Sequence, residues 1–313
     1  MKVLYLIQTY KNSEQVFRLV QTMKKSSPES YILISHNFNY SSLDVAPIRN
    51  LPDVEVISGK GGRGDFSLMQ GYLDGVDWLF SHDIKFDWLI NITGQDYPTQ
   101  PLARIEKFLA ETKYDGFIEY FELFPESEHN PCGSREVGDR YFYKYRRLSG
   151  PLCRWQRMLI KLPQIAINNA QSYVRINSGF GLMVGVLATP SPFKDCYLCY
   201  RGSYFHTLSR RCVQYLHNFS RQNPDLKSYY EKTCLPDESF IQTILVNSRL
   251  FNFCNDNKRY IDWAGSRHGH PRILTADDYP TLTKEGIHFA RKFDMTYNNK
   301  ILDMLDVRIL HDS

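Results

Sequence analysis

Residues 1–23, MKVLYLIQTYKNSEQVFRLVQTM, contain the pattern that decides the fold class. Val3–Ile7 is a continuous apolar run typical of a buried β-strand, and Glu14–Met23 then repeats apolar residues at helical spacing. The alternation continues along the first third of the chain, with strand-like runs at Tyr31–Ser35, Val54–Ile57 and Trp88–Ile92 and helical patterns at Phe66–Phe80 and Leu102–Leu109. This order predicts an α/β fold with a mostly parallel central sheet flanked by helices on both faces.

The length and composition predict one large domain over residues 1–313. Hydrophobic residues make up 42% of the chain and charged residues 23%, which leaves enough apolar material for a sizeable core. From about residue 122 the alternation gives way to a stretch rich in Tyr, Arg and Lys. We therefore expect a first half at 1–121, an inserted region at 122–171 in the middle of the chain, and a second half at 172–313.

Charge and aromatic content limit the class of partner. The net charge of +4 is small and the basic residues are spread along the chain, so no nucleic-acid partner is expected. The 21 Tyr, 19 Phe and 4 Trp suit a cleft that stacks rings on bases and sugars, although most of them are expected in the core. Seven cysteines without regular spacing predict no disulfide framework.

The N-terminal apolar run is too short for a signal peptide, and no stretch approaches the roughly 20 apolar residues that span a bilayer. We therefore expect a cytoplasmic protein, with association at the inner face of the membrane left open. Leu152–Ile167 has the pattern of a basic amphipathic helix with Trp155, Leu159, Ile160 and Leu162 on one side. We expect this side to pack against the main domain; membrane-surface binding is the alternative.

Polar turns follow the predicted strands, at the sheet edge where ligands bind in such folds. They contain Gln8, Asn37 and the glycine-rich turn Gly59–Gly64 with Arg63. The turn lacks the ending of a phosphate-binding P-loop, so a plain surface loop and a nucleotide-contacting turn are both open. Asp96, after the strand at Trp88–Ile92, either meets a ligand or hydrogen-bonds its own turn.

Pro236-Asp237-Glu238 precedes an apolar-periodic run and has the composition of a helix start. Carboxylates at a helix N-terminus are stabilised by the helix dipole, so the acids can be simple caps. A carboxylate held in this way also stays ionised, as a general base requires.

Arg291 and Lys292 stand between Phe289 and Phe293, an arrangement in which one cation can face a cleft as a counter-charge for a diphosphate. The strand ends carry no Asp-X-Asp pair to hold a divalent metal, so we expect a metal-free site. His268 and His270 have no clear third ligand, and zinc is not expected.

Four segments together resemble glycosyltransferase family 14, the core-2/I-branching β-1,6-N-acetylglucosaminyltransferases and the related peptide O-xylosyltransferases. They are Asp87–Pro98, Gly202–Arg210, Pro236–Thr243 and Phe289–Asp294, in the family's order. The resemblance implies a GT-A-like fold, inversion at the anomeric carbon and no cofactor or metal. It also implies that 1–121 binds the nucleotide and that 172–313 holds the acceptor and the catalytic base.

The resemblance also implies residue roles. Glu238 falls on the family's base, and Lys292 and Arg272 fall on the cations that bind the diphosphate. Asn37 stands where the family has an acid near the nucleoside, and Arg63 matches a nucleotide-contacting Arg. Trp263 resembles the aromatic acceptor platform. The predicted donor-binding residues are Gln8, Asn37, Arg63, Asp96, Arg272 and Lys292, and the predicted acceptor-binding residues are Trp263, Glu119 and Asp237.

We therefore expect an inverting, metal-independent transferase that moves a sugar, with GlcNAc the first choice, from a UDP-sugar to a hydroxyl of a glycan acceptor. A bacterial-type cytoplasmic enzyme of polysaccharide synthesis fits a chain that starts directly at its first strand. The alternatives are a xylosyl or other sugar transferase and a non-catalytic glycan- or nucleotide-binding protein. Nothing in the sequence predicts the oligomeric state.

Overall fold

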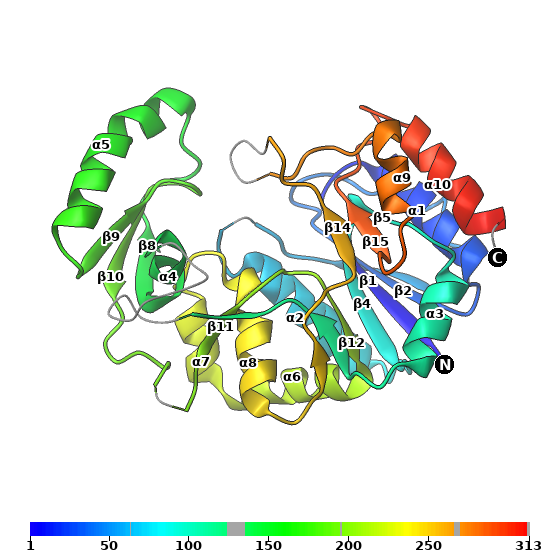
Figure 1. The fold of residues 1–313 in the computed structure, drawn as a ribbon, viewed down its shortest axis with the longest axis horizontal. Helices are drawn as coiled ribbons and strands as arrows, with labels where there is room; N and C mark the ends of the chain where they lie inside the picture. Colours follow the sequence, from blue (N-terminus) through cyan, green and yellow to red (C-terminus); the bar gives the residue numbers. More distant parts are fainter. Residues whose placement is uncertain (63, 124–134, 195, 266–269, 312–313) are drawn as a thin grey trace.

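A seven-stranded sheet forms the centre of the computed structural model, which describes residues 1–62, 64–123, 135–194, 196–265 and 270–311 (Figure 1). The strand order is β13-β6-β12-β4-β1-β2-β3. Four neighbouring strands are parallel and coincide with the predicted apolar runs: β1 (Val3–Thr9), β2 (Tyr31–His36), β3 (Val54–Ser58) and β4 (Trp88–Thr93). The predicted α/β class with a mostly parallel sheet is confirmed.

The remaining strands of this sheet come from later parts of the chain. They are β6 (Gly116–Ile118), β12 (His206–Ser209) and β13 (Phe253–Cys254). β12 lies antiparallel between β4 and β6, whereas β13 is parallel to β6. The second half of the chain thus extends the sheet that the first half begins.

Helices cover both faces of the sheet. Successive side chains of β1 point to opposite faces, and each face has its own hydrophobic core. Val3, Tyr5 and Ile7 lie in the core formed with α1 (Ser13–Ser26), α3 (Leu102–Glu111) and α10 (Lys300–His311). Leu4 and Leu6 lie in the core formed with α2 (Ser67–Ser81), α6 (Arg210–Gln222) and α8 (Phe240–Ser248). A short helix, α7 (Pro224–Tyr230), follows α6.

Two small sheets sit beside the carboxyl ends of the parallel strands. One consists of β5 (Asp96–Pro98), β15 (Phe289–Arg291) and β14 (Arg259–Ile261), with a 3-10 turn, η2 (Ala276–Asp278), and α9 (Tyr279–Leu282) next in space. The other pairs β7 (Phe121–Leu123) with β11 (Cys199–Arg201). Another 3-10 turn, η1 (Pro236–Glu238), precedes α8.

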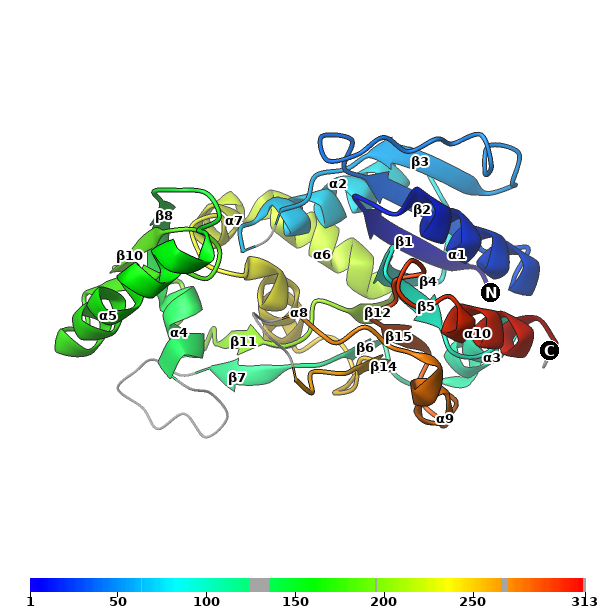
Figure 2. The ribbon, with the colours of Figure 1, turned by 90° about the horizontal axis from the view of Figure 1, so that it is seen from above.

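A separate three-stranded sheet with one long helix stands away from the main sheet (Figures 1 and 2). It follows α4 (Arg135–Phe142) and contains β8 (Tyr143–Arg147), α5 (Arg154–Ala170), β9 (Val174–Asn177) and β10 (Met183–Leu187). We call residues 143–187 the arm. It overlaps the insertion predicted at 122–171 only in part.

The helix predicted at Leu152–Ile167 is present as α5, but the expected packing of its apolar side is wrong. None of its residues is buried, and Trp155, Leu159 and Leu162 are 62%, 67% and 76% exposed. The polar side of the helix faces β9 instead, through hydrogen bonds of Asn168 to both backbone groups of Ile176. Among the described helices, none is long and apolar enough to cross a membrane.

Candidate active site

Polar loops meet at the carboxyl ends of the parallel strands, as the strand order predicts. The Asn37 N–H donates to the Thr9 carbonyl (2.9 Å), and the Gly94 N–H donates to the Gln8 carbonyl (3.1 Å). The Asn37 side chain donates to the Gly61 carbonyl (2.9 Å) and so tethers the glycine-rich turn. Gln8 is buried and donates through Nε2 to the Leu68 carbonyl (3.0 Å). Arg63 lies outside the described residues.

The glycine-rich turn also joins this edge to the Pro-Asp-Glu segment. The Leu235 N–H donates to the Gly64 carbonyl (3.4 Å), and the rings of Phe66 and Phe240 pack edge to face with centroids 5.3 Å apart. Gly64 has φ +83°, a backbone conformation that favours glycine, and an added Cβ would lie 2.3 Å from Phe180 in the arm. The turn therefore contacts the second half of the chain on one side and the arm on another.

The four segments that carry the family resemblance form one continuous chain of contacts. The Asp96 carboxylate pairs with Arg291, with 3.3 Å between Oδ1 and Nε, and the guanidinium of Arg291 lies 4.3 Å from the ring centroid of Phe205. The Gly202 N–H donates to the Glu238 carbonyl (2.7 Å). Residues more than a hundred positions apart in sequence are thus brought together by the fold.

Asp96 is 1% exposed, and the Thr93 N–H donates to its Oδ2 (2.5 Å). This hydrogen bond within the turn is one of the two alternatives that the sequence predicted for Asp96. Burial raises the pKa of the Asp96 carboxyl, with Arg291 and the Thr93 N–H opposing the shift. In this conformation the carboxylate contacts Arg291 and its own turn. The Asp96 side chain would have to move to contact the donor sugar nucleotide as predicted.

Arg259 is a half-buried cation that the sequence analysis missed. It lies in β14, stacks on Phe289 at 4.8 Å from the ring centroid, and donates through Nη2 to the Asn91 and His206 carbonyls at 3.4 Å. Burial lowers its pKa to about 10, with Asp96 opposing the shift. It escapes prediction from sequence because no pattern in its own segment marks an inward-facing Arg.

Glu238 lies at the end of η1, not in the first turn of α8. Ser239 adopts φ −140° and separates the two elements, so α8 begins at Phe240. The predicted helix start is therefore a short 3-10 turn followed by a break, which weakens the dipole argument for Glu238. Asp237 is 8% exposed, whereas the Glu238 side chain is 31% exposed and the more open of the two acids.

Arg140, a cation that the sequence analysis did not single out, lies beside Glu238. Arg140 Nη1 lies 3.2 Å from Glu238 Oε2, and the Arg140 side chain is 28% exposed. Arg140 lies in α4, inside the Tyr/Arg/Lys-rich stretch, where its neighbours gave no reason to single it out. Through this pair the carboxylate is held by an ion-pair partner instead of a helix dipole.

Glu119 is a second carboxylate near Glu238. It accepts a hydrogen bond from Asn257 Nδ2 (3.3 Å). Burial raises the pKa of Glu119, Arg201 opposes the shift, and the nearby charges of Asp256 and Glu238 add to it. A Cβ on Gly202 would lie 1.7 Å from the Glu119 carbonyl oxygen, so position 202 requires glycine. The N–H of the same glycine donates to the Glu238 carbonyl.

Arg272 and Trp263 belong to one loop after β14. Arg272 donates to Asp262 Oδ2 from Nε (2.9 Å) and Nη2 (2.5 Å), and to Asp278 from Nη1 (3.0 Å) and Nη2 (2.6 Å). Two carboxylates thus compensate the cation predicted to bind a diphosphate. Trp263 is 54% exposed. Lys292 is half-buried, and its carbonyl accepts from the Leu274 N–H (2.9 Å).

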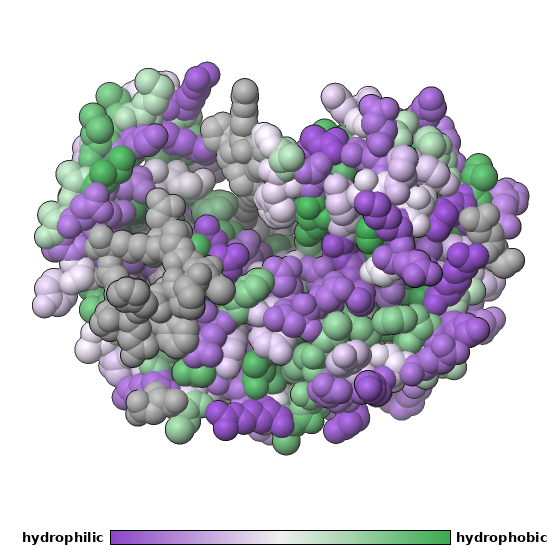
Figure 3. All heavy atoms as spheres, viewed as in Figure 1, coloured by the Kyte–Doolittle hydropathy of each residue, from purple (hydrophilic) through white to green (hydrophobic). Residues whose placement is uncertain are grey.

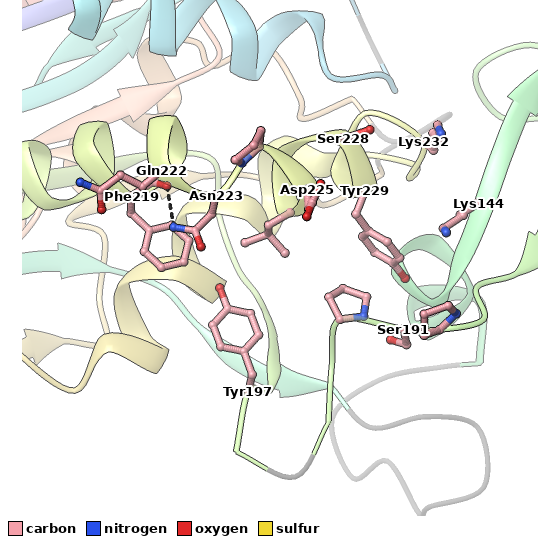
Figure 4. Close-up of a pocket in the computed structure, with 14 residues that line it drawn as sticks. Lys144, Ser191, Tyr197, Phe219, Gln222, Asn223, Asp225, Ser228, Tyr229 and Lys232 are labelled. Carbon is pink, nitrogen blue, oxygen red and sulfur yellow. Dashed lines mark hydrogen bonds between the residues drawn. The ribbon is translucent and has the colours of Figure 1, made fainter.

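Figure 3 shows the surface hollowed between the arm and the side that carries β14. A cavity of about 540 Å³ lies elsewhere, beside α7, and is lined by Lys144, Tyr197, Tyr229 and Lys232 among others (Figure 4). None of the residues predicted from the sequence lines this cavity. Within the described residues, no three His, Cys, Asp or Glu side chains are grouped as a metal site requires; His268 lies outside those residues.

The fold and the charged groups at its strand ends define an α/β protein of the class that binds ligands at the carboxyl edge of a parallel sheet. A family model described as Core-2/I-Branching enzyme matches residues 153–287. This match supports the resemblance to glycosyltransferase family 14 that the four segments predicted.

Two relatives illustrate the match. Xylosyltransferase 1 of Homo sapiens is 24% identical over 321 residues, which cover 94% of this chain and 29% of the relative. Xylosyltransferase 2 of Rattus norvegicus is 23% identical over 325 residues, which cover 94% and 32%. The chain thus spans about a third of the length of these relatives.

Among solved structures, Staphylococcus aureus TarS residues 1–349 in complex with UDP-GlcNAc superimposes with a TM-score of 0.29 and 15% identity, over 48% of this chain and 40% of that one. A nucleoside-diphosphate-sugar pyrophosphorylase from Vibrio cholerae reaches a TM-score of 0.34 at 11% identity, over 81% and 90%. Neither superposition supports a functional conclusion.

Proposed function

We propose that the chain is an inverting glycosyltransferase that moves a sugar from a UDP-sugar to a hydroxyl of a glycan acceptor, with Glu238 as the general base. The observation that carries the proposal is the half-open Glu238 carboxylate, held by Arg140, in a segment whose Glu238 carbonyl accepts from the Gly202 N–H of a second family segment. A base must be ionised and must remain reachable by the acceptor hydroxyl. The ion pair with Arg140 fixes the direction of the carboxylate, and the 31% exposure of the Glu238 side chain leaves it reachable.

The proposed reaction is a single displacement. Glu238 accepts the proton of the acceptor hydroxyl while that oxygen forms a bond to the anomeric carbon of the donor. The bond from the anomeric carbon to the diphosphate oxygen breaks at the same time, and its electron pair leaves with UDP. Attack opposite to the leaving group inverts the anomeric centre.

Lys292 is the proposed counter-charge for the departing diphosphate, in place of a metal ion. It follows β15, whose Arg291 already pairs with Asp96 in the same cluster. Arg272 was predicted for the same task, but its bonds to Asp262 and Asp278 favour a different one. We propose that it holds the loop that presents Trp263 to the acceptor.

The tethered glycine-rich turn supports the proposed donor side. Gln8 and Asn37 lie at adjacent strand ends, and Asn37 bonds the turn that contains Arg63. Backbone groups of such a turn suit a nucleotide. GlcNAc remains the first choice of sugar, and xylose is the second, because the similar proteins are named xylosyltransferases. We further propose that the protein works in the cytoplasm, on a growing polysaccharide or glycoconjugate.

A donor panel tests the activity. UDP release with UDP-GlcNAc, UDP-xylose, UDP-glucose and UDP-galactose should be clearly highest with one donor, and an added acceptor glycan should raise it. The same assay with a chelator should be unchanged. Strong inhibition by the chelator would contradict the metal-free mechanism, and no release with any donor would favour a non-catalytic binding protein.

The variant Glu238→Gln tests the base. It keeps the shape of the side chain but cannot accept the proton, so kcat should fall by about 10²–10⁴-fold while the Kd for UDP stays unchanged. Asp237→Asn is the matched control for a neighbouring buried acid. Retained turnover in Glu238→Gln, or a larger loss in Asp237→Asn, would place the base elsewhere.

A further inference from the structure

The helix α5 carries an unusual apolar stripe on its outer side. Trp155, Met158, Leu159 and Leu162 follow the spacing that aligns residues on one side of a helix, and they are 62–76% exposed. Other large exposed apolar side chains lie further along α5 and on the rest of the arm: Leu148, Ile165, Ile167, Tyr173, Val186 and Leu187. Ten of the twenty large hydrophobic side chains that are exposed among the described residues thus lie within residues 148–187.

The opposite side of α5 is polar and is bonded to its own sheet. Asn168 Nδ2 donates to the Ile176 carbonyl (3.0 Å), and Asn168 Oδ1 accepts from the Ile176 N–H (2.8 Å). Gln164 Oε1 accepts from Ser178 Oγ (2.6 Å). A surface helix of a globular protein normally turns its apolar side inward, and α5 does the reverse. The orientation is therefore held by specific hydrogen bonds.

Charge is segregated in the same part of the chain. Residues 140–194 contain nine Lys and Arg and no Asp or Glu. The remaining residues contain 29 basic and 34 acidic side chains, so the positive net charge of the whole protein comes from this segment. Arg154 and Lys161 are exposed on α5, beside the apolar stripe. Figure 3 shows green and purple side chains next to each other on this part of the surface.

We propose that the outer side of α5 binds the surface of a lipid bilayer that contains anionic headgroups. The exposed apolar stripe with its Trp matches the polarity of the acyl region of such a surface. The flanking cations, with no carboxylate on the helix, match the charge of the headgroups. A two-fold dimer through the same face would bring two positive arms together, which charge repulsion opposes. The helix is too short and too charged to span the bilayer, so it lies in the plane of the interface.

Docking through α5 also orients the site. The arm forms one wall of the recess that Figure 3 shows, so the recess would open beside the lipid surface. This places an acceptor attached to a lipid within reach. The binding itself does not depend on the proposed transferase activity and can be measured without any substrate.

Co-sedimentation with vesicles tests the proposal on the full chain. Binding should be strong to phosphatidylcholine vesicles with about 30% phosphatidylglycerol, at least about tenfold weaker to phosphatidylcholine alone, and weakened by added salt. Equal binding to both kinds of vesicle, or none to either, would overturn the proposal.

Two pairs of variants separate the apolar and electrostatic parts. Trp155→Gln/Leu159→Gln/Leu162→Gln should lose at least about tenfold in vesicle affinity, whereas Leu250→Gln/Val307→Gln, at equally exposed positions elsewhere, should bind as the parent does. Arg154→Glu/Lys161→Glu should also lose binding, and Lys25→Glu/Lys300→Glu should keep most of it. Unchanged binding of the α5 variants would overturn the proposal.

Trp fluorescence and light scattering test which residues touch the lipid and whether the stripe joins two copies. Vesicles should shift the Trp emission to shorter wavelength, and Trp155→Phe should remove that shift while keeping the binding. A shift that persists without Trp155 would place the contact elsewhere, since Trp263 is also exposed. Light scattering should show that the parent and the triple Gln variant have the same oligomeric state. A dimer lost in the variant would show instead that the stripe joins two copies.

Discussion

Arg140 Nη1 lies 3.2 Å from Glu238 Oε2, although the two residues are 98 positions apart. The pair joins α4, at the base of the arm, to the η1 turn before α8. Both side chains are roughly one-third exposed, so the carboxylate is oriented without being sealed from an acceptor. An ion pair of this kind fixes the direction of the carboxylate. The arm and the proposed base are therefore coupled at one contact.

The first prediction concerns this contact. Arg140→Met keeps the length of the side chain but removes the charge and the hydrogen bond, so kcat should fall by about 10–100-fold while the donor KM stays within about twofold, because a misplaced base costs turnover more than binding. Initial rates at varied donor concentration measure both. Arg140→Lys should recover part of kcat. A rise in donor KM at constant kcat would show that Arg140 binds the donor instead.

The second prediction concerns the glycine that bonds to Glu238. Gly202→Ala places a Cβ 1.7 Å from the Glu119 carbonyl oxygen, and only a backbone shift relieves that clash. The free energy of unfolding should fall by about 1–3 kcal/mol, and kcat should fall with it because η1 moves. Urea denaturation gives the stability. Gly150→Ala is the control, since its Cβ meets nothing within 4 Å and should change stability by less than about 0.5 kcal/mol.

The third prediction concerns the pH dependence of stability. Burial lowers the pKa of His288 to about 3, helped by Arg259 and Lys258, and burial likewise lowers the pKa of His206 to about 3. The unfolded chain has His pKa values near about 6.5, so between these limits the unfolded state binds protons that the folded state does not. Stability is complete above about pH 6.5 and falls as the pH drops toward 3, by about 1.4 kcal/mol per pH unit for each His.

Urea denaturation of His288→Gln between pH 5 and pH 8 measures this slope. The variant should lose about 1.4 kcal/mol per pH unit of the dependence below pH 6.5, the share of one His. His82→Gln, at an exposed position, should keep the full slope. Equal slopes for the parent and His288→Gln would contradict the assignment.

The fourth prediction separates two roles for Arg272. If it holds the loop through Asp262 and Asp278, Arg272→Ala should raise the acceptor KM about tenfold and leave the donor KM unchanged, because only the presentation of Trp263 suffers. Asp278→Asn, which weakens the same ion pair from the other side, should give the same pattern in milder form. A raised donor KM in Arg272→Ala with no change in Asp278→Asn would restore it as a diphosphate ligand.

Local sequence patterns were sufficient for the four parallel strands of the main sheet but not for β6, β12 and β13. The apolar runs became β1, β2 and β4 because a strand buried on both faces needs apolar side chains at consecutive positions, and the shorter run at Val54–Ile57 became the partly exposed β3. The start of α8 lies four residues after the predicted start at Pro236 because the acidic Pro236–Glu238 turn closes as a 3-10 turn. Element boundaries depend on such local hydrogen bonds, which composition does not specify.

These local patterns do not predict which residues distant in sequence contact one another. Arg140 and Arg259 gave no signal in their own segments, yet Arg140 pairs with Glu238 and Arg259 lies near Asp96. Arg272 did give a signal, through the family resemblance, but its two carboxylate partners lie ten residues before it and six residues after it. The sequence around an Arg does not show whether a ligand or a carboxylate of the same chain compensates its charge.

The sequence by itself determined the α/β class, the family resemblance and the order of the four segments, because hydrophobic periodicity and short motifs are local properties of the chain. Tertiary structure alone decided that Arg140 meets Glu238, that Gly202 lies between Glu238 and Glu119, and that α5 turns its apolar stripe outward. The same amphipathic pattern serves a helix packed inward or outward. The hydrogen bonds of Asn168 with Ile176 and of Ser178 with Gln164 settle which side faces the protein.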